Sequence, residues 1–423
     1  MSERDWQIGL VGTFDVENYG DVLFPLIAEA ELAERLGSVK LHCFSYEAKT
    51  AQEWPFPVTS VTELPRLAAG LDGLLVGGGF LVRFDKGVAP GYGPPLGIHH
   101  PTGYWLSPAL IALQHDVPVL WNAPGVHYED LPAWADPLME LTFSSSSYIA
   151  VRDEPSRAAL TRFVGRDRID LVPDTAFGIG RRLGAPPSFE FRRLRDAAGL
   201  TEPYIVVQGV RTLGACQPFL KAHPDRLRGF RLLALPIGPV NSDDTAVLDP
   251  GLPGLLTLPS WPQPLLMAEI IRHAEAVIGP SYHLAITALT AGVPVFSPQD
   301  LSAGKYPGLA GFDTIYPLPE ERSDPDWFFS RVGRTAVSPG VDAAVERLTI
   351  HWDRIVEILR RGATDTSVAV GRFWQSLPGV LEAAALRSKA EVAARERRIL
   401  SLEKSTSWKL TAPFRFVGRR MRR

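Results

Sequence analysis

Short apolar runs recur along this chain, and several are followed by a turn and then by a longer stretch with helical periodicity. An apolar run bounded by Gly, Pro or Asp is typical of a buried strand, and strands that alternate with helices indicate a parallel sheet. The runs fall into two series. The first comprises residues 6–12, 39–46, 72–76, 117–121, 148–151 and 169–172, and the second 204–208, 230–235, 254–258, 277–279 and 293–296.

A segment rich in Arg, Pro and Gly separates the two series and predicts a domain boundary. We therefore expect an α/β protein with two facing, doubly wound, Rossmann-like domains and a cleft between them. The expected parts are a first domain at 1–180, a linker at 181–202, a second domain at 203–340, a helical region at 341–400 and a basic amphipathic tail at 401–423.

The segment 276–296 has the clearest local pattern. Its apolar run breaks at Gly279-Pro280, and Ser281 is a good N-cap for an apolar helix that starts at Tyr282. His283 then lies in the first helical turn, at the carboxyl edge of the sheet, where open α/β sheets bind ligands. A helix-start histidine bonded to nearby backbone is the alternative interpretation.

Other polar or glycine-rich positions also follow strands of the first series. Asn18 and Asp21 lie in the first strand-to-helix turn, which has no GxGxxG dinucleotide pattern. The run 77–79 is three glycines, which allow close approach of a ligand or simply form a tight turn. Arg152 ends a strand, where it can meet an anion or pair with Asp153 or Asp174.

Composition narrows the class of protein. The two cysteines, Cys43 and Cys216, lie far apart in apolar surroundings, which disfavours a disulfide framework or a CxxC metal site. Without an apolar leader or a long apolar span, we expect a cytoplasmic protein.

Charge is distributed unevenly along the chain. The net charge is −3 overall, and residues 387–423 carry 12 basic and 3 acidic residues, so residues 1–386 carry −12. An acidic body argues against nucleic acid as a partner, and the basic tail suits an anionic membrane surface, where the protein would bind peripherally. A merely solvated tail is the alternative.

The order of the strand-end motifs resembles that of the polysaccharide pyruvyl transferase family. The resemblance covers roughly residues 6–300. It rests on Asn18-Tyr-Gly-Asp21, Gly77-Gly-Gly79, Val151-Arg-Asp153, Val172-Pro-Asp174, Gln208-Gly-Val-Arg211, Gly279-Pro-Ser-Tyr-His283 and Ala291-Gly-Val-Pro294. That family is similar in fold to two-domain glycosyltransferases of the GT-B type. The resemblance implies transfer of a pyruvyl group from phosphoenolpyruvate to sugar hydroxyls in surface or exopolysaccharide synthesis, forming a pyruvate ketal.

This chemistry assigns roles to the residues singled out above. His283 would transfer the proton, since an imidazole titrates near working pH. The donor would be held by Arg152, Arg211, Ser281 and Tyr282. The acceptor, a sugar or a lipid-linked oligosaccharide, would meet Asn18, Asp21, Gly77, Gly78 and Gly79. We expect phosphoenolpyruvate as co-substrate, no other cofactor and no metal.

One position departs from the pattern of the family and keeps other functions open. Many members have an Arg two residues before the histidine, where this chain has Ser281. The first alternative is a nucleotide-sugar glycosyltransferase of the GT-B type, and the second is a non-catalytic polysaccharide-synthesis partner at the membrane.

Overall fold

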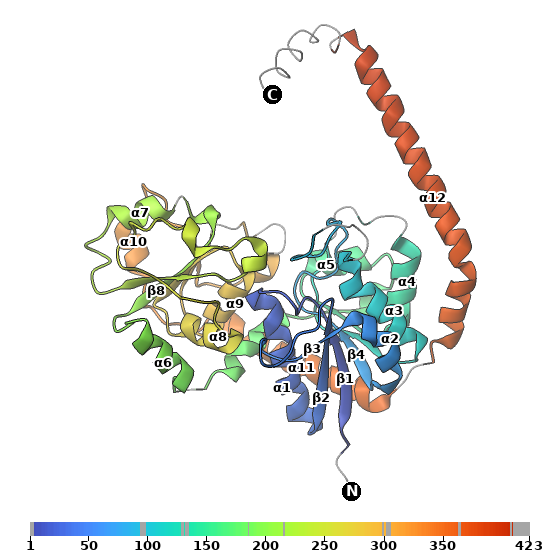
Figure 1. Cartoon of the computed structure of the whole chain (residues 1–423), viewed down its shortest axis with the longest axis horizontal. Helices are drawn as coiled ribbons and strands as arrows, with labels where there is room; N and C mark the ends of the chain where they lie inside the picture. The colour runs from blue at the N-terminus through green and yellow to red at the C-terminus, as the bar shows by residue number, and fades with distance from the viewer. Residues whose placement is uncertain are drawn as a thin grey trace.

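Two parallel α/β domains lie side by side, and a long helix projects away from the first of them (Figure 1). The computed structural model describes residues 4–93, 99–127, 131, 135–184, 186–214, 216–297, 300–301, 306–362, 365–406 and 408. The GT-B-type architecture expected from the sequence is therefore present, and the sheets place the functional residues.

The first sheet has seven strands in the order β3-β2-β1-β4-β5-β6-β7, and the second has six in the order β10-β9-β8-β11-β12-β13. All the strand pairs within these sheets are parallel. The direction of winding reverses between β1 and β4 and between β8 and β11, so each sheet has its switch point there. The strands are β1 (Trp6–Val11), β2 (Val39–Ser45), β3 (Val58–Ser60), β4 (Gly73–Val76), β5 (Val119–Trp121), β6 (Tyr148–Val151), β7 (Ile169–Leu171), β8 (Tyr204–Gln208), β9 (Arg231–Leu235), β10 (Leu255–Thr257), β11 (Ala276–Ile278), β12 (Val295–Ser297) and β13 (Ile315–Pro317).

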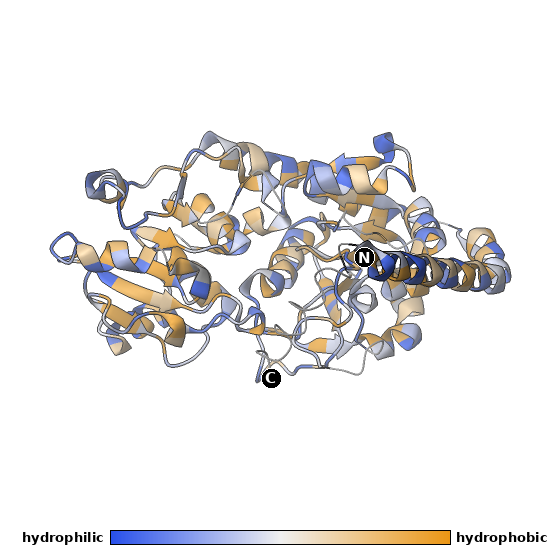
Figure 2. Cartoon of the chain, turned by 90° about the horizontal axis from the view of Figure 1, so that it is seen from above, coloured by the Kyte–Doolittle hydropathy of each residue, from blue (hydrophilic) through white to orange (hydrophobic). Residues whose placement is uncertain are grey.

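Helices cover both faces of the sheets, which is why the central strands read as continuous apolar runs (Figure 2). In β8, for example, all five residues are buried. The helices are α1 (Tyr19–Leu36), α2 (Leu64–Leu67), α3 (Leu106–Gln114), α4 (Asp136–Ser145), α5 (Glu154–Leu160), α6 (Phe189–Ala197), α7 (Cys216–Ala222), α8 (Pro264–Arg272), α9 (Tyr282–Thr290), α10 (Pro325–Phe329), α11 (Pro339–Arg361) and α12 (Ser367–Lys404).

One hydrophobic core runs through both domains. Helix α1 of the first domain packs against α8 and α9 of the second, and α11 returns from the second domain to α1. Ile27 of α1, Ile286 of α9 and Trp352 of α11 are all buried in the same cluster. The two domains therefore meet through apolar packing, which fixes the walls of the cleft.

The segment predicted as a linker contains a helix. Residues 189–197 form α6, whose N-cap Ser188 accepts a hydrogen bond from Phe191 N at 3.1 Å. Phe191 is buried and stacks on His273 with ring centroids 4.8 Å apart. Because Phe191 is apolar and buried, this otherwise charged segment packs against the second domain as a helix and does not form an extended linker.

Helix α12 stands away from the body after its first turns (Figure 1). Val370 belongs to the core that includes α3 and α4, whereas the side chains beyond it are largely exposed. Among the described residues, no helix combines the length and the apolar character needed to cross a membrane. Most of the predicted basic tail, residues 409–423, lies outside the described residues.

A buried histidine on α11 gives the fold a pH dependence. His351 lies between Tyr148 Oη at 3.1 Å and Asn122 Oδ1 at 3.0 Å. Burial lowers the pKa of His351 from 6.5 to about 3, so the folded state keeps this ring neutral. The unfolded chain binds a proton at this position below its ordinary pKa, whereas the folded chain does so only near pH 3.

Stability is therefore expected to fall as the pH drops from 7 towards 3. His351 alone should lower the free energy of unfolding by about 2 kcal/mol between pH 7 and pH 5. Urea unfolding of the wild type and of His351→Gln at both pH values measures this effect. The unfolding free energy of His351→Gln should fall less between pH 7 and pH 5 than that of the wild type. An equal fall in the two proteins would contradict the conclusion that His351 is buried in the neutral form.

Candidate active site

A cavity of about 340 Å³ lies between the domains, at the carboxyl ends of the switch-point strands β1, β4, β8 and β11. This is the ligand position expected for open α/β sheets. The first domain contributes Thr13, Asn18, Asp21, Phe80, Leu81, Arg83, Pro90, Pro101, Tyr104 and Arg152. The second contributes Gln208, Val210, Ile237, Gly238, Asn241, Asp243, Pro280, Ser281, Tyr282, His283 and Tyr306.

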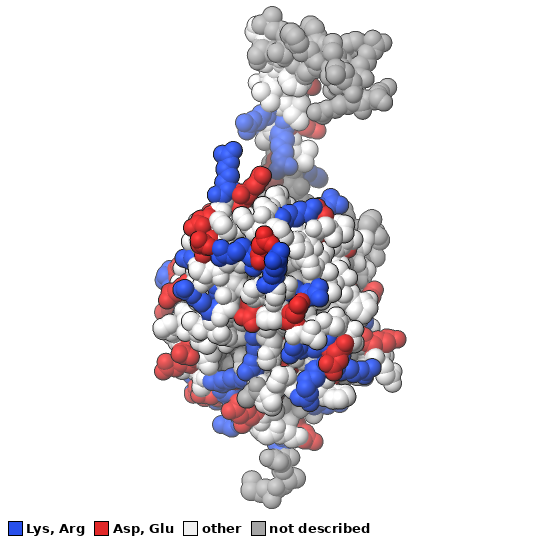
Figure 3. Space-filling view, turned by 90° about the vertical axis from the view of Figure 1, so that its left-hand side faces the viewer, with Lys and Arg blue, Asp and Glu red and all other residues white. Residues whose placement is uncertain are grey.

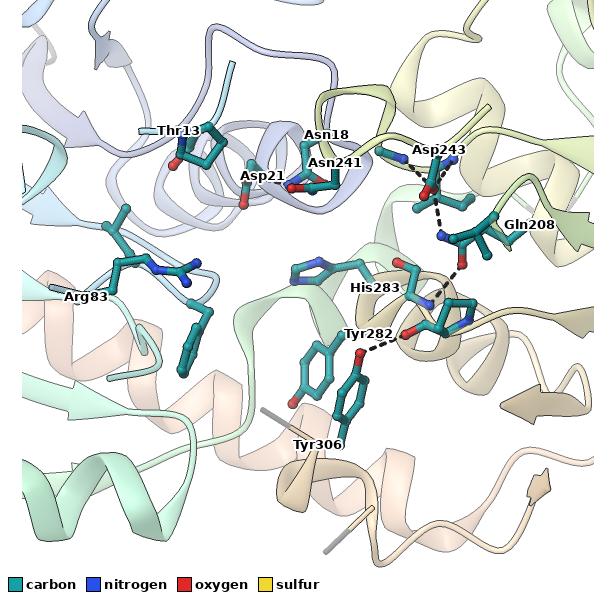
Figure 4. A pocket seen from close by; sticks show the side chains of 18 of the residues that line it. Thr13, Asn18, Asp21, Arg83, Gln208, Asn241, Asp243, Tyr282, His283 and Tyr306 are labelled. Atoms are coloured by element: carbon teal, nitrogen blue, oxygen red, sulfur yellow. Dashed lines mark hydrogen bonds between the residues drawn. The ribbon is translucent and has the colours of Figure 1, made fainter. Parts of the chain in front are cut away.

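His283 reaches into the middle of this cavity from the first turn of α9, and Arg83 lies on the opposite side (Figure 4). Ser281 caps the helix, because its Oγ accepts a hydrogen bond from Leu284 N at 3.4 Å. Gln208 Oε1 accepts another from Ser281 N at 2.9 Å. The start of α9, and with it the imidazole, is thus held by the end of β8.

Gly20 on α1 makes room for the imidazole. A Cβ atom at Gly20 would lie only 1.7 Å from His283 Nδ1. Phe24, one turn further along α1, meets the same ring edge-on with centroids 5.4 Å apart. The backbone of the first domain therefore forms one side of the histidine pocket.

A buried hydrogen bond joins α1 to α9 beside this contact. Thr287 Oγ1 lies 2.9 Å from the carbonyl oxygen of His283, to which it donates, and 2.7 Å from Tyr19 Oη. Tyr19 N also donates to Ile237 O across the domain boundary at 2.9 Å. The chain around Asn18-Tyr-Gly-Asp21 is therefore an interdomain contact as well as part of the cavity wall.

Asp174 brings charge to His283 from the other domain. Its Oδ2 lies 3.8 Å from His283 Nε2 and 3.1 Å from Arg152 Nη1, and its side chain is fully buried. Burial raises the pKa of Asp174, but the His283 and Arg152 side chains more than offset this effect and leave the pKa below its usual range. A buried carboxylate at this position stabilises the protonated form of the imidazole.

Arg152 is also buried, with its side chain only 1% exposed. Besides Asp174, its Nε lies 3.4 Å from Asp153 Oδ2, and its guanidinium lies 4.7 Å from the ring centroid of Tyr282. The sequence left open whether Arg152 meets an anion or pairs with Asp153 or Asp174, and in the structure it pairs with both carboxylates. Its Nη2 is nevertheless buried without a hydrogen-bond partner among the described residues.

A hydrogen-bond network holds the floor of the cavity in place. Gln208 Nε2 donates to Asp243 Oδ2 at 2.6 Å, and the same oxygen accepts from Gly238 N at 2.9 Å. Tyr306 Oη donates to Pro280 O at 3.0 Å, next to Ser281. These buried contacts fix the loops that follow β8, β9 and β11 relative to one another.

Two expected contributions lie elsewhere. Arg211 is exposed at the start of the 3-10 helix η7 (Arg211–Leu213) and does not line the cavity, although Gln208 and Val210 do. The glycines 77–79 do not line it either. All three have positive φ, and a Cβ at Gly78 would lie 2.4 Å from the ring of Phe24. They form a tight turn that presents Phe80 and Leu81 instead.

Asn18 and Asp21 line the cavity as expected, and Asn18 Nδ2 donates to Asp21 Oδ2 at 2.7 Å. The segment 83–104, which follows the glycine turn, supplies further lining residues that the sequence did not single out. Of these, Arg83 pairs with Asp85 through Nε–Oδ1 at 2.7 Å and Nη2–Oδ2 at 2.5 Å. The sequence offered one signal for Arg83, which is its position four residues after Gly79, just beyond the glycine turn that follows a strand.

Tyr104, another lining residue, belongs to an aromatic cluster around buried Asp15. Asp15 accepts hydrogen bonds from Tyr92, from Tyr104 at 3.5 Å and from Glu47 N at 2.8 Å. Tyr46 packs on Tyr104 with centroids 4.5 Å apart, and burial raises the pKa of Tyr46 to about 12. The described part of the segment 83–104 is therefore a packed wall of the cavity.

Polar groups of this cavity suit an organic anion. Within the described ranges, no set of three His, Cys, Asp or Glu side chains has an arrangement that could hold a metal. The cavity instead combines an imidazole, two guanidinium groups and the N-terminus of α9, whose dipole favours negative charge. This arrangement can hold an anion and move a proton.

Comparison with models of protein families shows the family to which the chain belongs. The sequence model of polysaccharide pyruvyl transferases matches residues 18–297, more than half of the chain. The chain belongs to this family. The matched residues include both walls of the cavity and His283, so the family assignment supports a transferase that acts in polysaccharide pyruvylation. Among curated protein sequences, none matches the chain significantly.

Solved structures support the fold of this family member. A UDP-GlcNAc 2-epimerase from Neisseria meningitidis, bound to UDP-GlcNAc, has a TM-score of 0.54 at 13% identity, with 84% of this chain and 100% of that one covered. The UDP-GlcNAc 2-epimerase from Methanocaldococcus jannaschii has a TM-score of 0.52 at 13% identity, with 85% of this chain and 100% of that one covered. The enzyme from Rickettsia bellii has a TM-score of 0.52 at 11% identity, with 85% of this chain and 97% of that one covered. At such identities the likeness concerns the GT-B-type fold alone.

The contact between Gly20 and His283 yields a prediction for this pyruvyl transferase family member. Gly20→Ala should displace the imidazole or separate α1 from α9, because the new methyl group overlaps the ring. We expect a destabilisation of about 1–3 kcal/mol and a loss of any activity that depends on His283. Thermal unfolding measures the first effect.

Gly70→Ala is the matched control, since a Cβ at Gly70 would meet nothing within 4 Å. Both variants add the same methyl group, so a difference between them reports on the histidine pocket. Equal unfolding temperatures for the two variants would show that α1 does not approach the imidazole in this way.

Proposed function

We propose that the cavity transfers the pyruvyl group of phosphoenolpyruvate to two hydroxyls of a sugar and forms a pyruvate ketal. The observation that carries this proposal is that Asp174 Oδ2 lies 3.8 Å from His283 Nε2 and 3.1 Å from Arg152 Nη1, so that one buried carboxylate links two cavity-lining residues from different domains. They combine a proton-transfer group with a cationic anchor. Both are needed for a small donor with a carboxylate and a phosphate.

The donor would lie between Arg152 and the N-terminus of α9. Arg152 keeps its charge, because burial lowers its pKa but the neighbouring Tyr282, Asp174 and Asp153 side chains leave the pKa raised. Its Nη2, which has no hydrogen-bond partner in the described part of the chain, can donate to a carboxylate or a phosphate oxygen. The positive end of the α9 dipole takes the place of the family Arg that Ser281 replaces.

Proton transfer would start the reaction. Protonated His283 gives a proton to the methylene carbon of phosphoenolpyruvate, and C2 becomes electron-deficient. A sugar hydroxyl adds to C2, and its proton returns to the imidazole. The bond between C2 and the phosphate oxygen then breaks, a second hydroxyl adds, and its proton leaves with the phosphate. One donor and one diol thus give one ketal and one phosphate.

The acceptor would occupy the wall formed by the first domain. Asn18, Asp21 and Thr13 offer hydrogen-bonding groups, and Tyr104 and Phe80 offer ring faces of the kind on which sugars stack. Arg211 has no part in this proposal, because it does not line the cavity. Arg83, which does, is the second guanidinium group of the site.

A lipid-linked acceptor would explain the charge of the tail. Residues 387–423 carry a net charge of +9 on a body that is otherwise acidic, and anionic lipids attract such a segment. We infer that the chain acts on the cytoplasmic face of a membrane and binds there peripherally.

Replacing His283 tests the proposed role of the imidazole. His283→Gln should lower phosphate release from phosphoenolpyruvate about 10²–10⁴-fold in the presence of a glycoside panel, since general acid–base catalysis supplies that much. His273→Gln is the control, because His273 stacks on Phe191 in the second domain, outside the cavity lining. Wild-type turnover by His283→Gln would remove the assignment.

The same assay separates the other candidate functions. Turnover of UDP- or GDP-sugars, but not of phosphoenolpyruvate, would favour a glycosyltransferase on this fold. Saccharide binding without turnover of either donor would favour a non-catalytic partner protein.

Asp174 should set the pH range in which His283 is protonated. Loss of the carboxylate in Asp174→Asn favours the neutral imidazole, so the pH–rate profile should shift towards lower pH. Asp153→Asn is the control, because Asp153 also contacts Arg152, whereas Asp174 is the carboxylate that lies 3.8 Å from His283 Nε2. Asn can cap a helix in both places. Profiles of phosphate release that shift equally in the two variants would contradict the role of Asp174.

A further inference from the structure

The projecting part of α12 carries a row of apolar and small side chains that the body of the protein does not cover. Leu381 is 61% exposed, Val392 52%, Ile399 55% and Leu402 53%. With the residues between them they follow a spacing of four and three, which is the pattern of a coiled-coil seam. We call this row the α12 seam; it consists of Leu381, Ala385, Ser388, Val392, Arg395, Ile399 and Leu402.

The seam has no partner within the described part of its own chain. Figure 1 shows this half of α12 pointing away from both domains, and Figure 2 shows hydrophobic and hydrophilic residues together along it. The seam spans roughly 30 Å at 1.5 Å per residue. An exposed apolar row of this length marks an interaction surface.

We propose that the α12 seam pairs with the same seam of a second copy of the chain, in antiparallel orientation. When the twofold axis of the pair passes between residues 393 and 394, each small side chain of the seam lies opposite a large one of the second copy. Ala385 faces Leu402 of the second copy, and Ser388 faces its Ile399. Alternation of small and large side chains is what fills the space between two helices.

Arg395 fits the antiparallel pair as well. It faces Val392 of the second copy, so its aliphatic stem covers apolar surface while its charged end reaches solvent. In a parallel pair in register, Arg395 would face Arg395, Ser388 would face Ser388, and Ala385 would face Ala385. That arrangement combines a like-charge contact with two gaps.

Charges beside the seam also favour the antiparallel pair. Glu391 lies opposite Arg398 of the second copy, and Lys389 lies opposite its Glu396, which gives four attractive contacts by symmetry. Only Glu382 and Glu403 oppose each other with like charge. The parallel pair would bring Glu391 beside Glu396 and Arg398 beside Glu403, so that its repulsive and attractive contacts cancel. Basic and acidic side chains lie together on the projecting helix (Figure 3), as these paired contacts require.

A charge exchange at the seam tests the orientation in the full-length chain. Glu391→Lys should raise the dissociation constant of the dimer about tenfold in sedimentation equilibrium, because two attractive contacts become repulsive. The double variant Glu391→Lys/Arg398→Glu should restore association. A parallel pair predicts the opposite for the single change, since it would remove the repulsion between Glu391 and Glu396.

Cross-linking provides an independent measurement. Mixing Ser388→Cys with Ile399→Cys should give a disulfide-linked dimer under mild oxidation, whereas neither variant should cross-link efficiently by itself. The native Cys43 and Cys216 are buried and do not compete. The proposal is overturned if the wild type remains a monomer at every concentration, if it is captured only by anionic vesicles, or if Ser388→Cys alone cross-links as readily as the mixture.

Discussion

The structure of the site depends on the close packing of α1 against α9. These two helices belong to different domains, and their contact is so tight that the His283 ring occupies the place of a side chain at Gly20. The hydrogen bond between Tyr19 and Thr287 joins the same two helices. Because this interface is also part of the common core, the position of the imidazole is set by apolar packing between the domains.

Charge compensation is the second constraint. Arg152 is buried with Asp153 and Asp174, so the two carboxylates outweigh its single positive charge and leave a net charge of −1 before any ligand arrives. A protonated His283 removes this excess negative charge and makes the group neutral. Donor binding and imidazole protonation would therefore support each other, since each is favoured by the charge of the other.

The sequence predicted much of this framework because it depends on local patterns. Apolar runs gave the strands of both parallel sheets, and Ser281 correctly indicated the start of α9. The sequence analysis missed the edge strands β3 and β13, because they are only partly buried and their residues, Val-Thr-Ser and Ile-Tyr-Pro, do not form an apolar run. The segment predicted as a linker contains α6, because Phe191 packs into the hydrophobic core. The composition of the segment, rich in Arg, Pro and Gly, does not reveal this contact.

Site residues were predicted less completely, for a physical reason. Sequence order shows that a residue follows a strand, but not which way its side chain points after the turn. Gln208 therefore reaches the cavity floor whereas Arg211, three residues on, is exposed.

By itself, the sequence determined the two-domain α/β class, the family and the histidine at the start of a helix, because each is encoded within a short segment. Only the tertiary structure decided that Asp174 meets His283, that Gly20 makes room for the ring, and that Arg152 is shared by two carboxylates. These contacts join residues that are distant in the chain, and they exist only once the two sheets have packed against each other.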